Sequence, residues 1–166
     1  MAFETSFASI DVSEANIFVG LANTGFADPA SLPDDWIGFS HLEDTTTIQF
    51  VVRKNGAGTS YTIDSSAGGS DLTFADSTVA TQSATAAQIP SNTVRVGFRF
   101  IPAGQEGVGT TGVYRVYYNG NPIYDQSATT VPDDIGLAVS MGTNTKTTTT
   151  TNLMVDYIKV VTERVV

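Results

Sequence analysis

The stretch Leu153–Val161 is the part of the sequence that most constrains the fold. Apolar and polar residues alternate along it and β-branched side chains are frequent, which is the pattern of a strand with a buried face. Similar period-2 stretches separated by turn residues recur along the whole sequence, whereas the spacing typical of an amphipathic helix does not. The sequence therefore predicts an all-β protein closed by a strand near its C-terminus.

Two dipeptides mark the expected hairpins. Asn55-Gly56 and Asn119-Gly120 combine residues that readily adopt positive φ, so each predicts a tight turn between antiparallel strands. The threonine-rich stretch 143–151 lacks proline and is interpreted as strand ends and a hairpin loop, and no strand is assigned to 64–88. Strands are expected at residues 3–7, 17–21, 36–39, 48–54, 60–63, 94–101, 113–118, 123–124, 137–141 and 153–161. This many short strands predicts a two-sheet jelly-roll sandwich.

Length and charge limit the class of protein. With 166 residues, 41% of them hydrophobic, the chain fits one sandwich domain over residues 1–166. The formal net charge is −9, from 17 acidic and 8 basic residues, and binding to nucleic acid needs clustered cations, so no nucleic-acid partner is expected. There is no cysteine, so packing alone must stabilise the fold.

The first residues, Met1–Phe7, lack the basic start and the apolar run typical of a signal peptide, and no segment comes near the roughly 18 apolar residues that a membrane span needs. We therefore expect synthesis in a cytosol and no membrane partner.

Several segments, taken in order, resemble one family of sandwiches. They are Phe3–Phe7, Ile17–Leu21, Asp35–Phe39, Ile48–Val52, Val96–Phe98, Val116–Gly120 and Val155–Ile158. Their order and spacing are similar to those of concanavalin-A-like jelly rolls, and among these to the virion proteins of tailed phages, over most of the chain. The resemblance implies two antiparallel sheets and a capsid decoration or cement protein. Its partner would be the major capsid protein, on the outer surface of the phage head, and the chain would form a homo-oligomer.

The catalytic signature of the glucanases with this architecture is missing. Those enzymes carry a Glu-x-Asp-x-(x)-Glu run that places two carboxylates on one strand face, whereas the glutamates here are isolated from one another. His41, the one histidine, has no second imidazole or nucleophile near it in sequence and is interpreted as structural. We therefore expect no enzymatic activity. The alternative is a glycan hydrolase whose acids converge from distant positions.

Three arginines and one phenylalanine are the candidate docking residues. Arg95 and Arg99 share a strand face, with Gly97 between them, and Arg115 lies on the next predicted strand. Together they predict a basic patch suited to pairing with carboxylates of a protein partner. The alternative is a solvated face on which the arginine stems cover aromatic neighbours. Phe3, close to the N-terminus, would be covered by a neighbouring subunit.

A carbohydrate-binding module for host adhesion is the alternative function. It needs an exposed aromatic platform, for which Trp36 and Tyr118 are the candidates, although the apolar neighbours of Trp36 favour burial. No cofactor is expected. Calcium is the alternative, because the pairs Asp34-Asp35 and Asp133-Asp134 carry the oxygen ligands it prefers, but Pro-Asp-Asp is also an ordinary turn opening.

Overall fold

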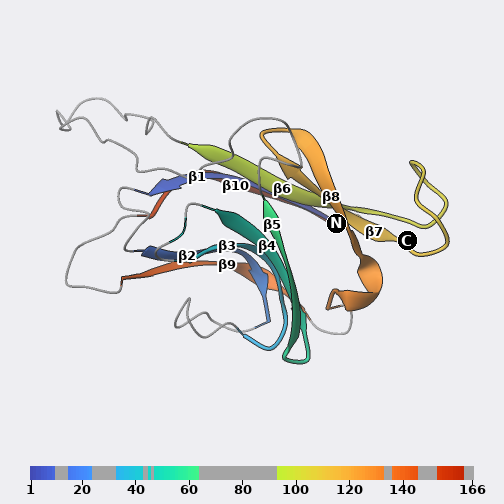
Figure 1. The fold of residues 1–166 in the computed structure, drawn as a ribbon, viewed down its shortest axis with the longest axis horizontal. Helices are drawn as coiled ribbons and strands as arrows, with labels where there is room; N and C mark the ends of the chain where they lie inside the picture. Colours follow the sequence, from blue (N-terminus) through green and yellow to red (C-terminus); the bar gives the residue numbers. More distant parts are fainter. Residues whose placement is uncertain are drawn as a thin grey trace.

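Two antiparallel five-stranded sheets stack face to face in the computed structural model of the chain (Figure 1). The structure describes residues 1–9, 15–23, 33–42, 45, 47–63, 93–132, 136–145 and 153–162. The predicted all-β sandwich is confirmed, and its arrangement is compatible with a jelly roll. The candidate pair Asp133-Asp134 and the unassigned stretch 64–88 lie outside the described residues.

The two sheets are named A and B. Sheet A contains, in spatial order, β10 (Leu153–Val161), β1 (Ala2–Ser9), β6 (Val94–Ile101), β7 (Val113–Tyr118) and β8 (Asn121–Ser127). Sheet B contains, in spatial order, β5 (Ala57–Ile63), β4 (Ile48–Lys54), β3 (Trp36–His41), β2 (Ala15–Ala22) and β9 (Ala138–Thr145). A short 3-10 turn, η2 (Ala128–Thr130), follows β8.

Both predicted hairpin turns are present. Asn55 and Gly56 have φ angles of 53° and 77° between β4 and β5, and Asn119 and Gly120 have φ angles of 48° and 83° between β7 and β8. The prediction of a hairpin loop in the threonine-rich stretch 143–151 is wrong. β9 pairs with β2 in sheet B and β10 pairs with β1 in sheet A, so the chain crosses between sheets there.

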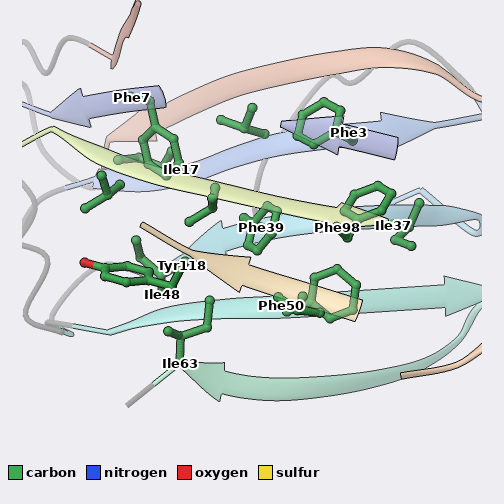
Figure 2. Packing of buried hydrophobic residues seen from close by; sticks show 14 of the residues in the cluster. Phe3, Phe7, Ile17, Ile37, Phe39, Ile48, Phe50, Ile63, Phe98 and Tyr118 are labelled. Carbon is green, nitrogen blue, oxygen red and sulfur yellow. The ribbon is translucent and has the colours of Figure 1, made fainter. Parts of the chain in front are cut away.

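Four phenylalanine rings occupy the centre of the core between the sheets (Figure 2). Phe98 of β6 lies 5.3 Å from Phe3, 5.8 Å from Phe50 and 6.3 Å from Phe39, measured between ring centroids. All four side chains are buried. Aromatic pairs of this kind contribute about 0.5–1.5 kcal/mol each beyond the burial of their area. Phe98 therefore ties β1 of sheet A to β3 and β4 of sheet B.

A second buried cluster lies on the other face of sheet B. Phe18 of β2 and Trp36 of β3 are four residues apart in the β2–β3 register, yet their ring centroids are 3.8 Å apart. The row between them is the opposed pair Gly20 and Gly38. A Cβ added to Gly20 would lie 2.6 Å from the Cα of Gly38 and 2.5 Å from the Ile37 carbonyl oxygen. Only glycine therefore allows this close approach of β2 and β3.

Replacing Gly20 by alanine is expected to lower the free energy of unfolding. The new methyl group would meet backbone atoms that cannot move independently, and overpacking of this kind costs about 1–3 kcal/mol. Gly109→Ala is the matched control, because nothing lies within 4 Å of its added Cβ. Urea unfolding of both variants measures the difference. Equal stabilities for the two variants would contradict the account.

Candidate functional site

The three predicted arginines lie together on the outer face of sheet A. Arg95 and Arg99 are exposed on β6, on either side of Gly97, and Arg115 of β7 is the cross-strand partner of Arg99. Alternation along β6 turns these side chains outward because Val96 and Phe98 face the core. The predicted clustering of the three arginines is confirmed.

Each of these arginines has an acidic partner, so the surface is not the purely basic patch that was predicted. Arg95 donates from Nε to Glu4 of β1. Arg99 donates from Nη2 to Oε2 of Glu106 at 2.5 Å. The partners come from another strand and from the segment after β6, so spacing along the sequence could not reveal them.

Arg115 binds its acidic partner in the bidentate geometry that guanidinium favours. Its Nε and Nη2 donate to the two carboxylate oxygens of Asp125 on β8, each at 2.8 Å, and its Nη1 lies 3.5 Å from Glu106. The hydrogen bonds to Asp125 raise the pKa of Arg115 above its ordinary value. Glu106 thus links Arg99 to Arg115 through a shared carboxylate.

Glu4 accepts a second hydrogen bond on the same face. The Tyr157 hydroxyl on β10 donates to Oε1 of Glu4 at 2.6 Å. This hydrogen bond, followed by the one from Arg95, lowers the pKa of Glu4 below the ordinary value. Partial burial, and then the bond to the Glu4 carboxylate, raise the pKa of Tyr157. Glu4 is therefore held as a carboxylate by groups from two neighbouring strands.

A hollow of about 310 Å³ opens on this face over Gly97. In the register of sheet A, Lys159, Glu4, Gly97 and Tyr117 form one cross-strand row, so the missing side chain of Gly97 leaves a gap in that row. A Cβ at Gly97 would lie 2.7 Å from the Phe3 carbonyl oxygen. The close approach of β1 and β6 thus requires glycine at the floor of the hollow.

The charged groups around the hollow favour an anionic ligand. Arg95, Arg99 and Lys159 contribute three cations to its lining, and Glu4 contributes one carboxylate. Lys159 makes no ion pair within 4.0 Å in the part of the chain that the structure describes. Its ammonium group is thus the cation most available to an incoming carboxylate. Tyr117, which also lines the hollow, adds an aromatic wall.

Three other candidate residues are buried. Phe3 is 1% exposed and packs against Phe98, so its prediction as a docking residue is wrong. The interior of the sandwich covers it, and no neighbouring subunit is needed. Trp36 is 0% exposed in the second cluster and Tyr118 is 7% exposed in the main core, where burial raises its pKa. The prediction that Trp36 and Tyr118 form an exposed glycan platform is therefore wrong.

His41 and Asp35 have structural partners. The His41 ring is buried at the end of β3, and its Nδ1 donates to the Thr47 carbonyl oxygen at 3.0 Å. Asp35 accepts from the backbone N–H of Asn55 at 2.7 Å and from the Nδ2 of Asn23 at 3.2 Å. Asp35 thus braces the β4–β5 turn. Within the described ranges, no three His, Asp or Glu side chains are grouped so as to hold a metal ion.

Comparisons of the chain with protein-family models, with curated proteins and with solved structures found no match. The resemblance to phage virion proteins therefore stays a prediction. Among the described residues there is no helix with the length and apolar character needed to cross a membrane.

Replacing Tyr157 by phenylalanine is expected to raise the pKa of Glu4 toward 4.5, the ordinary glutamate value, because the strongest influence on that pKa is the Tyr157 hydroxyl. The folded state lowers the pKa of Glu4, so this interaction stabilises the fold above about pH 4.5 and is lost as the pH falls through the folded-state pKa. The stability deficit of the variant should therefore be present at neutral pH and shrink in acid. Carboxyl NMR titration and urea unfolding at several pH values measure both effects.

Tyr117→Phe is the control for this experiment, because Tyr117 lies on the same face and Glu4 accepts no hydrogen bond from it. An unchanged Glu4 titration in Tyr157→Phe, or an equal change in both variants, would contradict the assignment.

Proposed function

We propose that this chain is a virion structural protein that decorates a phage head and binds the major capsid protein through the outer face of sheet A. The observation that supports a docking role is the hollow over Gly97, with Lys159 left without an ion pair among the described residues beside two exposed arginines. The order of segments that resemble phage virion proteins supports the phage setting. The protein would act by contact and not by turnover.

The docking face has properties that suit a protein partner. The guanidinium groups of Arg95 and Arg99 are held by Glu4 and Glu106 before binding, so less side-chain entropy is lost than for unpaired arginines. Arg99 and Arg95 present guanidinium groups, which pair with carboxylates in a defined geometry. An acidic side chain of a capsid subunit would enter the hollow and approach Lys159. Glu4 would keep its hydrogen bond from Tyr157.

Stabilisation of a shell would come from the number of copies. Each contact is small, but a subunit that touches two or more capsid subunits gains an effective concentration for its later contacts, and avidity then exceeds the single affinity by about 10²–10⁴. Opening of the shell would require the loss of many such contacts together. This mechanism needs a rigid domain with an exposed charged face and needs no catalytic group.

A carbohydrate-binding module is the second candidate, and one observation favours it. Tyr117 lines the hollow beside Glu4 and Arg95, so an aromatic ring lies next to polar groups as glycan binding requires. This site replaces the predicted pair Trp36 and Tyr118. A glycan array with the intact chain, repeated with Tyr117→Ala, tests this function.

The docking proposal predicts that Lys159→Glu weakens binding to heads at least tenfold, because it places a carboxylate beside Glu4 where the partner's carboxylate should lie. The measurement is co-sedimentation of the purified chain with heads that have been stripped of it, taken from virions of the source phage. Binding should also weaken as salt is raised. Lys54→Glu, on β4 of sheet B, is the control with the same change in net charge.

Two results would overturn the proposal. One is the absence of the chain from density-purified virions when they are probed with an antibody raised against it. The other is equal head binding by Lys159→Glu and Lys54→Glu, both checked for an unchanged midpoint of thermal unfolding. Glycan binding that is lost in Tyr117→Ala, without any head binding, would support the carbohydrate-binding function instead.

A further inference from the structure

The two lateral sides of the sandwich differ in how they are closed. On the side of β5 and β8, the rings of Tyr61 and Tyr124 stack with centroids 4.0 Å apart and an interplanar angle of 6°. On the side of β9 and β10, Val139, Met141 and Val160 are 45%, 43% and 39% exposed. One side is therefore sealed by an aromatic pair, and the other leaves large apolar side chains in contact with solvent.

These exposed side chains occupy inward-facing positions. Met141 and Val139 of β9 are the cross-strand partners of Val19 and Leu21, which are buried in the core. Val160 of β10 is in the same way the partner of Phe3. Residues opposite each other on antiparallel strands point to the same side of the sheet, so these three side chains extend the core to an open edge.

β9 also lacks the features that normally protect an edge strand. Natural edge strands carry charged residues or proline, which block pairing with another chain. β8 contains Pro122 and Asp125, and β10 contains Asp156 and Lys159. β9 has eight residues with neither a charge nor a proline. β5 is also uncharged, but its exposed edge is formed by small and polar residues.

We propose that β9 pairs with β9 of a second copy of this chain, in antiparallel orientation about a two-fold axis at Met141. Side-chain alternation requires that odd-numbered residues of one copy face odd-numbered residues of the other, so that the inward-facing side chains of both copies lie on one side. Pairing of Met141 with Met141 and of Val139 with Thr143 meets this requirement and places the two exposed Met141 side chains next to each other at the axis. Sheet B then continues from one copy into the other. Backbone groups on the edge of β9 that faces away from β2 gain partners.

A second copy fits this edge better than a foreign strand. Each chain has a net charge of −9, so two copies repel each other overall, and the contact that adds least to this repulsion is one without charged residues, such as β9, which is uncharged over its whole length. Self-pairing also covers the exposed apolar side chains of both copies at once. An isologous contact of this kind closes as a dimer and does not propagate.

The pairing would also decide how the chain meets a shell. This consequence rests on the proposed function, whereas the pairing itself does not. The two-fold axis lies perpendicular to the continuous sheet B, so both A sheets lie on the same side of it. The two hollows over Gly97 would then face in one direction. A dimer would present two docking faces to a shell, which is the geometry that bivalent binding needs.

Sedimentation equilibrium of the full chain, without heads, tests the pairing. We expect a dimer whose dissociation constant falls as salt is raised, because salt screens the repulsion between two acidic chains. Met141→Lys should raise that constant at least tenfold at an unchanged midpoint of thermal unfolding. Thr59→Lys is the matched control, because Thr59 is an exposed, inward-facing residue on the opposite edge strand β5.

A second measurement fixes the register. The chain has no cysteine, so Met141→Cys introduces a single thiol, and mild oxidation should give a covalent dimer in high yield while Thr59→Cys stays monomeric. A wild-type chain that is monomeric at every concentration and salt level would overturn the proposal. So would a dimer that survives Met141→Lys, dissociates in Thr59→Lys or fails to cross-link through Cys at position 141. Head binding by a strictly monomeric chain would contradict the pairing and leave the proposed docking function unaffected.

Discussion

Packing of Phe98 between the sheets is the interaction on which the rest of the structure depends. Phe98 contacts Phe3 on the neighbouring strand and Phe39 and Phe50 on the opposite sheet, so it fixes the register of β1 against β6. Alternation then decides what lies outside, because each inward ring places its sequence neighbours on the outer face. Glu4 and Gly97 are opposite each other outside because Phe3 and Phe98 are opposite each other inside. The candidate site is thus a consequence of how the core packs.

The sequence predicted the features that depend on local pattern. Asn-Gly turns and the alternation of Arg95 and Arg99 around Gly97 involve neighbouring residues, and the structure confirms them. Local sequence patterns do not indicate which distant strands pair. For this reason neither the ion pair of Arg95 with Glu4 nor the crossing from β9 to β10 was predicted. Phe3 was misassigned because a position near a terminus suggests fraying, whereas β1 is flanked by β10 and β6.

Tyr117 shows how one signal was missed. Two adjacent tyrosines on a strand must point to opposite faces. Their partners on β6 decide which one points outward, because cross-strand partners share a face. The sequence contains this information, because Val96 belongs to the apolar face of its strand and Gly97 does not. Tyr118 was chosen as the exposed ring, yet it pairs with Val96 and lies in the core, while Tyr117 pairs with Gly97 and lines the hollow.

The chain separates two kinds of surface, a charged outer face on sheet A and an uncharged edge at β9. We expect binding through the first to weaken, and pairing through the second to strengthen, as salt is raised. The central claim is that the outer face of sheet A meets a viral shell. A cryo-EM reconstruction of decorated heads tests it most directly. We predict that the hollow over Gly97 faces the capsid surface, with a capsid carboxylate near Lys159. A reconstruction in which sheet A faces solvent, or in which the heads carry no density for this chain, would contradict the account.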